Sequence, residues 1–315
     1  MEFSRRDLLK SSLATAGLLS LGGCAPYQST RPTRPFLFCL NTSTISGQKL
    51  GILDQLQVTA DAGYDGIEIW VRDVQHFLKE GGQLADIKQK AQDLNLNIES
   101  AISFPRWIVD DESVRSAALE QMRQDVDMLA QIGCPRIAAP PVGASQEPGL
   151  NLDAAASRFY DICAVGEETG VVPQLELWGF SANLSRIGEV MYVLSESGYP
   201  NAKTILDAYH IYKGGSPFTG LSVLSKSASD MFHMNDYPAD PPRDTIKDAD
   251  RIMPGDGVAP FDVILPVLRN EEKPMILSLE LFNHEYWQQD ALQVAKIGLE
   301  KMQAVVNRVF EAKSG

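Results

Sequence analysis

Four polar residues recur at repeat-like intervals in the second half of the chain and could together bind a cation. Glu176 lies in the run QLELW, Asp207 in ILDAYH, His233 in FHMND and Glu280 in LSLEL. Three carboxylates and one imidazole suit a divalent ion such as Mn²⁺, Co²⁺ or Mg²⁺, and suit a thiolate-preferring site poorly. Any one of these residues alone is more simply explained as a helix cap or an ion-pair partner. The prediction of a metal site therefore rests on the regular spacing of all four.

The elements that would position these residues alternate between short strand-like runs and longer amphipathic runs from residue 36 onward. Eight strands are expected at 36–40, 66–70, 96–101, 136–139, 171–177, 204–206, 230–234 and 275–281. Eight helices are expected near 49–62, 82–94, 113–132, 152–169, 184–197, 217–228, 260–270 and 288–309. This alternation predicts an α/β protein with one (β/α)8 TIM barrel over 36–315. A doubly wound open sheet is the alternative, disfavoured because 41–47 is not a glycine-rich phosphate loop.

Side-chain alternation places two of the carboxylates inside the predicted barrel. In QLELW the leucines share one strand face, while Glu176 and Trp178 share the other. Glu280 likewise alternates with leucines in LSLEL. If the leucines face the helices, both glutamates point into the barrel mouth, where a charge is costly unless it is paired or binds a metal.

The N-terminal segment is expected to direct export. Residues 4–10 (SRRDLLK) resemble a twin-arginine signal, an apolar run follows, and Leu21-Gly22-Gly23-Cys24 looks like a bacterial lipobox. These motifs predict a signal peptide at 1–23 and a lipidated tether at 24–35, which would place the protein on the periplasmic side. The membrane contact would be a lipid anchor at Cys24. An ordinary signal peptide with a chance cysteine is the simpler alternative.

Charge and cysteine content narrow the choice of partners. The formal net charge of −13 disfavours nucleic acid as a partner. Cys39, Cys134 and Cys163 each lie in an apolar run and are expected to be buried free thiols. These features leave homo-oligomerisation open.

Together these motifs resemble the xylose-isomerase-like barrel superfamily of sugar isomerases and epimerases, over about residues 36–310. Glu-Leu-Trp, Asp-Ala-Tyr-His, His-Met-Asn-Asp, Pro-Gly-Asp-Gly and Ser-Leu-Glu fall in that family's order. The resemblance implies that Glu176, Asp207, His233 and Glu280 bind one divalent ion. Manganese is the first choice, with Co²⁺, Mg²⁺ or Zn²⁺ as alternatives. It also implies that Glu176 and Glu280 are catalytic and transfer protons.

The same resemblance implies substrate contacts from His210 and from an arginine in the proline-rich loop 237–257. Arg243 is the candidate for that arginine, with Arg251 as the alternative. Asp236 is expected beside the substrate or an imidazole, and Trp178 is expected to stack on a sugar face. For Trp178, simple packing is an equally good interpretation.

The function that the resemblance implies is a metal-dependent isomerase or epimerase acting on a sugar or keto-sugar through an enediolate. An inosose-dehydratase-like lyase acting on a keto-cyclitol or keto-glycoside is one alternative. A non-catalytic sugar-binding lipoprotein is another. Ala182 stands where ketose 3-epimerases of the family carry a second glutamate, which disfavours a simple free ketohexose. A nuclease of the same superfamily is disfavoured by the acidic charge and by the presence of only four histidines.

Overall fold

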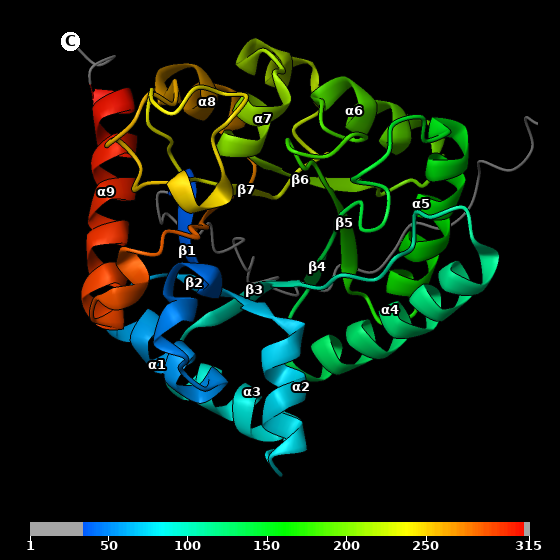
Figure 1. Ribbon diagram of the computed structural model, residues 1–315. Coiled ribbons are helices and arrows are strands. Elements are labelled where there is room, and N and C mark those ends of the chain that lie inside the picture. Colours follow the sequence, from blue (N-terminus) through cyan, green and yellow to red (C-terminus); the bar gives the residue numbers. More distant parts are fainter. Residues whose placement is uncertain (1–33, 312–315) are drawn as a thin grey trace, which may run out of the picture. The chain divides into compact units, whose positions relative to one another are not determined.

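Residues 34–311 are described by the computed structural model and form a closed barrel of parallel strands (Figure 1). Each strand pairs with the next in the sequence, and the last pairs with the first, which excludes the open-sheet alternative. The eight strands are β1 (Phe36–Asn41), β2 (Gly66–Trp70), β3 (Asn97–Ile102), β4 (Arg136–Ala139), β5 (Val172–Glu176), β6 (Lys203–Asp207), β7 (Met231–His233) and β8 (Met275–Leu279). The predicted (β/α)8 barrel is therefore confirmed.

Helices surround this barrel (Figure 1). They are α1 (Ile52–Ala62), α2 (Val71–Lys79), α3 (Leu84–Asp93), α4 (Glu112–Ile132), α5 (Leu152–Glu167), α6 (Ile187–Glu196), α7 (Ala208–Gly214), α8 (Phe261–Leu268) and α9 (Ala291–Glu311). The strand leucines Leu175, Leu177, Leu277 and Leu279 are buried in one apolar cluster with residues of these helices. The residues that alternate with these leucines along the strands therefore face the barrel interior, as the sequence pattern predicted.

Two helices differ from the sequence prediction. The short helix α2 directly follows β2 and was missed. The expected helix at 217–228 was wrong, because only a 3₁₀ turn forms at Phe218–Val223. Pro217 precedes this turn and Gly220 lies inside it, and both residues disfavour a longer helix. The helix that follows β6 is instead α7, which begins at once because the Asp207 carboxylate accepts a hydrogen bond from the His210 backbone N–H at 2.8 Å.

Apolar side chains fill part of the barrel interior below the predicted site. Cys39, Ile205, Met231 and Ile276 form a buried cluster of their own. Ile205 and Met231 each precede a predicted metal ligand by two residues, so they face the same side of their strands one step deeper. This cluster lies below the polar groups at the carboxyl ends of the strands, the end at which barrels of this kind carry their active sites.

The long loop after β7 is held by one carboxylate. Asp236 is fully buried and accepts hydrogen bonds of 2.8 to 3.0 Å from four backbone N–H groups, those of Tyr237, Gly255, Gly257 and Ala259. Its backbone also pairs with Ile252 in an antiparallel bridge. The expected role of Asp236 beside the substrate is therefore corrected. Its oxygens face the loop backbone, and they tie both ends of the loop to the barrel.

The predicted export signal and the lipidated Cys24 lie outside the described residues. Among the residues that are described, no helix is long and apolar enough to cross a membrane. Cys39, Cys134 and Cys163 are buried and unpaired, as expected.

Replacing Asp236 by alanine should destabilise the protein, because four backbone N–H groups would lose their acceptor. We expect a loss of about 2–4 kcal/mol in the free energy of unfolding, measured by urea denaturation. The exposed Asp244 in the same loop is the matched control, and Asp244→Ala should change stability little. Equal stability of the two variants would show that the loop does not depend on Asp236.

Candidate active site

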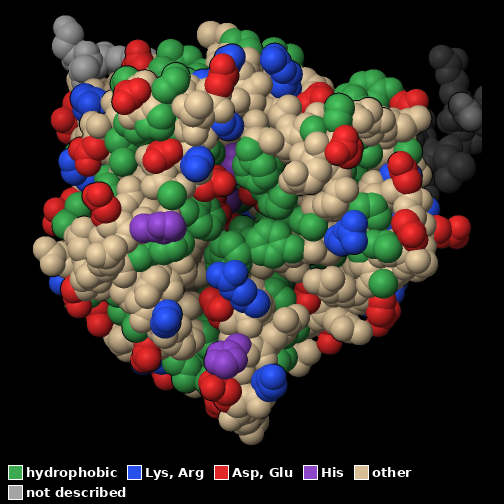
Figure 2. All heavy atoms as spheres, in the orientation of Figure 1, with side chains coloured by type: hydrophobic (Ala, Val, Ile, Leu, Met, Phe, Trp, Pro, Cys, Tyr) green, Lys and Arg blue, Asp and Glu red, His purple; other side chains and the backbone are tan. Residues whose placement is uncertain are grey.

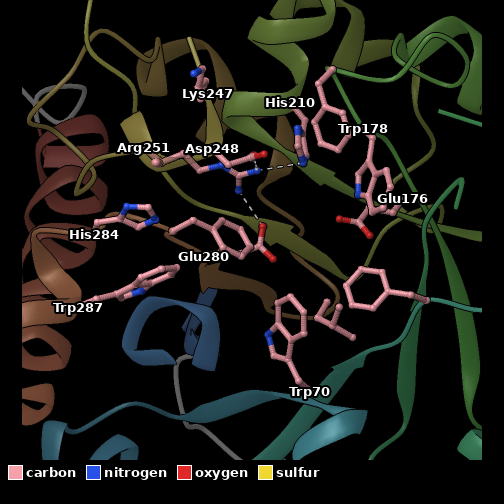
Figure 3. Close-up of a pocket in the computed structure, with 15 residues that line it drawn as sticks. Trp70, Glu176, Trp178, His210, Lys247, Asp248, Arg251, Glu280, His284 and Trp287 are labelled. Atoms are coloured by element: carbon pink, nitrogen blue, oxygen red, sulfur yellow. Dashed lines mark hydrogen bonds and ion pairs between the residues drawn. The ribbon is translucent and has the colours of Figure 1, made fainter. Parts of the chain in front are cut away.

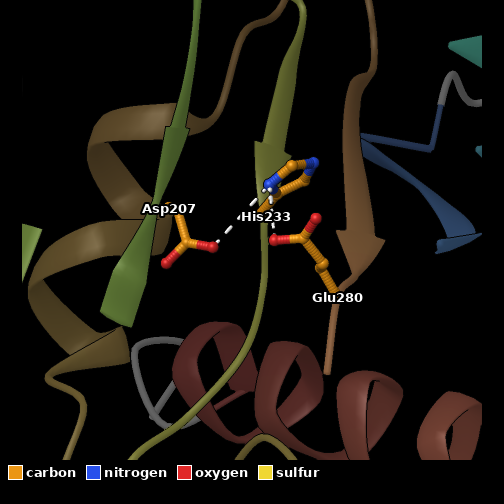
Figure 4. A group of neighbouring side chains, drawn as sticks. All are labelled: Asp207, His233 and Glu280. Carbon is orange, nitrogen blue, oxygen red and sulfur yellow. Dashed lines mark ion pairs between the residues drawn. The ribbon is translucent and has the colours of Figure 1, made fainter. Parts of the chain in front are cut away.

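The ends of three neighbouring strands bring Asp207, His233 and Glu280 together (Figure 4). Asp207 ends β6, His233 ends β7, and the two residues are paired across these strands. Glu280 directly follows β8. One potential ligand atom from each residue lies within 4.8 Å of the other two, and all three residues are buried. The structure therefore gathers three of the four predicted metal ligands into one group.

The orientation of the His233 ring favours a cation between these side chains. Its Nε2 lies 2.9 Å from Oε2 of Glu68. An ionised carboxylate can only accept, so Nε2 carries the hydrogen and a neutral ring would present the Nδ1 lone pair on its other side. Among the described residues Nδ1 has no hydrogen-bond partner, and it lies 3.3 Å from Glu280 and 3.7 Å from Asp207. A lone pair facing two carboxylates is stable only with a proton or a metal ion between them, so the residues fit a divalent ion.

Glu68 on β2 is a residue whose role the sequence did not reveal. Its Oε2 accepts hydrogen bonds from the Asn41 side chain at 2.9 Å and from the Ser278 hydroxyl at 2.7 Å, in addition to the His233 contact. The alternation in GIEIW indicates only that Glu68 shares a strand face with Gly66 and Trp70. In the structure Glu68 pairs with His233 and fixes the tautomer and direction of this candidate metal ligand, an arrangement common in metalloproteins.

Charges at the site largely compensate one another. Burial alone would lower the pKa of His233, but the carboxylates of Glu280 and Glu68 raise it well above its usual value. Burial would raise the pKa of Glu280, but His233 and Arg251 outweigh it and lower that pKa. Burial likewise opposes ionisation of Asp207, whose pKa is held well below its usual range mainly by Arg251. Glu280 and Asp207 therefore stay ionised although both are buried.

Glu176, the fourth predicted ligand, lies beside this group. It ends β5, is buried, and points toward Glu280 across the inner end of a pocket (Figure 3). It is not one of the three residues whose ligand atoms lie within 4.8 Å of one another. Burial, and then the charge of Glu280, raise its pKa to about 8. In this structure Glu176 is therefore a carboxyl group with access to the pocket and a strong tendency to hold a proton.

Arg251, rather than Arg243, is the loop arginine at the pocket. Its guanidinium is buried, and Nη1 donates to Asp207 at 3.0 Å and to Glu280 at 2.8 Å. It also lies 4.5 Å from the ring centre of Tyr209. The Arg243 side chain is half exposed and does not line the pocket. The preference for Arg243 is therefore corrected, because the bridge that Asp236 makes with Ile252 carries the neighbouring Arg251 inward.

His210 on α7 offers a free hydrogen-bond donor. Its Nε2 lies 3.0 Å from Nη2 of Arg251. Arginine only donates, so Nε2 accepts and the hydrogen of the neutral ring is on Nδ1. Burial and the Arg251 charge lower the pKa of His210, which keeps the ring neutral. Nδ1 is buried and has no partner among the described residues, and the His210 side chain lines the pocket.

The pocket above this group has a volume of about 530 Å³ and opens at the carboxyl end of the barrel (Figure 2). Apolar side chains line much of the opening, and acidic side chains and a histidine lie at its bottom (Figure 2). Trp178, predicted to stack on a sugar, lines the pocket together with Glu176, His210, Arg251 and Glu280. The volume lies in the range of about 300–1,000 Å³ typical of small-molecule sites.

Residues 56–305 match the model of a known family, described as the xylose isomerase-like TIM barrel. The chain belongs to this family. An inosose isomerase of Halalkalibacterium halodurans is 23% identical over 277 residues, which cover 86% of this chain and 97% of the relative. A fructoselysine 3-epimerase of Shigella flexneri is 25% identical over 230 residues, which cover 69% and 80% of the two chains.

Among solved structures, the fold is similar to that of the IOLI protein with a bound zinc atom. The TM-score is 0.79 at 20% identity, and the match covers 87% of this chain and 99% of the other. This likeness concerns the fold. The predicted resemblance to sugar isomerases and epimerases is confirmed at the level of the family.

Removing the charge of Glu68 should weaken metal binding. Glutamine keeps the size and one accepting oxygen but cannot raise the basicity of His233, so Glu68→Gln should lower Mn²⁺ and Zn²⁺ affinity about tenfold or more, measured by competition with a chelating dye. Glu99→Gln is the matched control, because Glu99 is also a buried glutamate inside a barrel strand but pairs with Arg136. Unchanged affinity in Glu68→Gln, or an equal loss in both variants, would contradict the role given to Glu68.

Proposed function

We propose that this chain is a divalent-metal-dependent isomerase or epimerase that acts on a sugar or keto-sugar through an enediolate. The observation that carries the proposal is the His233 Nδ1 atom, fixed by Glu68 and facing Asp207 and Glu280 at the inner end of a pocket. Family membership and the names of the two curated relatives support the same class of reaction.

Asp207, His233 and Glu280 would hold the ion, and Glu176 would complete the set. Mn²⁺ is the proposed metal, because carboxylate oxygens and one imidazole suit it, and Co²⁺, Mg²⁺ and Zn²⁺ fit the same donors. A divalent ion bound there supplies Lewis acidity, which makes the C–H beside a carbonyl more acidic.

The protein's own groups would then move the proton. Glu280, held by Asn41 at 3.2 Å and by Arg251 at 2.8 Å, is a fixed carboxylate that can take a proton from the substrate carbon. Glu176 faces it and, within the described part of the chain, has no charged hydrogen-bond donor, so it can return a proton from another direction. His210 Nδ1 and the Arg251 guanidinium are donors that can orient substrate oxygens. Return to the same carbon gives epimerisation, and return to the neighbouring carbon gives isomerisation.

Export as a twin-arginine lipoprotein, a periplasmic location and homo-oligomerisation stay predictions. A protein folded and loaded with metal before export would be consistent with a twin-arginine signal.

Metal removal should destabilise the folded protein, because the ion binds the native state selectively. At a free Mn²⁺ concentration one hundred times the Kd, binding contributes about 2.7 kcal/mol, and EDTA should abolish this contribution. Calorimetry should therefore show a lower Tm after EDTA in the wild type and no EDTA effect in Asp207→Asn. A wild-type Tm that is unchanged after confirmed metal removal would count against the site.

Solvent exchange tests the chemistry directly. In D₂O with Mn²⁺, the wild type should incorporate deuterium beside the carbonyl of at least one member of a panel of ketoses, keto-cyclitols and keto-glycosides, as read by NMR. Glu280→Gln should lower the rate by at least about 100-fold, because it removes the proposed base. Exchange with loss of water would identify the lyase alternative. Absence of exchange across the panel, with metal bound, would leave the non-catalytic sugar-binding alternative.

A further inference from the structure

One side of the pocket is a continuous wall of rings. Neighbouring ring centres along it lie 5.1 to 6.3 Å apart. In spatial order the rings of this aromatic wall are Phe282, Trp70, Phe104, Trp178, Phe180 and His210. The rings come from the carboxyl ends of β2, β3, β5, β6 and β8, so the wall follows much of the barrel rim. Charged residues lie on the other side, where the loop after β7 contributes Lys247, Asp248 and Arg251 (Figure 3).

The wall offers almost no hydrogen bonds to a ligand. The indole N–H of Trp70 already donates to Asn41 at 3.1 Å. The Trp178 side chain is hydrogen-bonded to Glu176. The phenylalanines have no polar atoms, and only His210, at the inner end, keeps a free donor. A second sugar ring, with hydroxyl groups around its edge, would find few partners here, whereas an apolar planar group would lose little on desolvation.

Two rings of the wall are exposed to solvent. Phe104 and Phe180 are 38% and 44% exposed, and among the described residues no other phenylalanine or tryptophan is as exposed. Both line the pocket next to Trp178, and apolar atoms around the opening form a broad surface (Figure 2). Exposed aromatic groups gathered at a cavity indicate a surface that a ligand covers.

The wall is also longer than one sugar needs. A single sugar ring stacks on one or two aromatic faces, and the group of Asp207, His233 and Glu280 sets where its reacting carbons must lie. The rings from Phe104 to Phe180 continue beyond that position toward the opening. This leaves an apolar part of the pocket that a free monosaccharide would not fill.

We propose that Phe104, Trp178 and Phe180 form a subsite for a planar apolar group joined to the sugar, so that the substrate class is a glycoside with an aromatic aglycone. This inference rests on the proposed function only in that the sugar part occupies the inner end of the pocket. The aglycone stacks between the exposed phenylalanines, and the sugar oxygens reach His210 and Arg251.

Paired ligands test the subsite without requiring turnover. Phenyl and methyl glycosides of glucose, galactose and xylose are titrated against the Mn²⁺-loaded wild type, with binding followed by calorimetry. For the sugar that binds best, the phenyl glycoside should bind about tenfold or more tightly than its methyl partner. In Phe104→Ala, Phe180→Ala and the double variant, this ratio should fall toward one while Mn²⁺ affinity is unchanged. Tyr160→Ala, which removes an equally exposed ring elsewhere, should keep the ratio.

Equal affinity for the two members of every pair would overturn the subsite, as would a phenyl preference that survives the double variant or no detectable binding of any phenyl glycoside. These outcomes separate from those of the proposed function. If deuterium exchanges into free keto-sugars but phenyl glycosides bind no better than methyl glycosides, the aglycone subsite is wrong and the proposed enzymatic function stands. If phenyl glycosides bind more tightly but no substrate exchanges deuterium, the subsite stands and the proposed catalysis is wrong. Melting temperatures of the alanine variants near that of the wild type establish that they fold.

Discussion

The hydrogen bond between Glu68 and His233 crosses the barrel and determines how the rest of the site is arranged. It joins β2 to β7, strands that are not neighbours in the sheet, so it requires the closed barrel. By fixing the hydrogen on Nε2, it turns Nδ1 toward Glu280 and Asp207. Those carboxylates are buried, and burying an uncompensated charge costs several kcal/mol. Cations must therefore balance them, which is why the geometry suits a divalent ion and why Arg251 contacts both.

The loop after β7 depends on a second buried carboxylate. The carboxylate oxygens of Asp236 accept hydrogen bonds from backbone N–H groups at both ends of the loop. The backbone bridge between Asp236 and Ile252 fixes the position of the neighbouring Arg251. The guanidinium of Arg251 then links the loop to the carboxylates and to His210. Arg251 therefore connects, through hydrogen bonds, pocket residues at the ends of β6 and β8 with the loop after β7. The charged side of the pocket is built from this coupling, while the aromatic side comes from the carboxyl ends of β2, β3, β5, β6 and β8.

Much of the fold was predictable because its signals are local. Strand alternation and repeat length depend on residues near one another, and they located all eight strands and the inward direction of Glu176 and Glu280. Helix assignments failed where a short element broke the expected repeat, at α2, and where Pro217 and Gly220 prevented a helix that periodicity favoured. The choice between Arg243 and Arg251 depended on the path of an irregular loop, which carries no periodic signal.

The sequence by itself determined the barrel, the family and the set of residues that can bind a metal, because those follow from side-chain type and from spacing along successive strands. Only the tertiary structure decided how these residues are used. It paired His233 with Glu68, which lies 165 residues away along the chain, turned Asp236 to the loop, brought Arg251 inward and assembled separate rings into one wall. The physical reason is that hydrogen-bond partners and stacking faces are set by distances across the closed barrel, and spacing along the chain does not specify those distances.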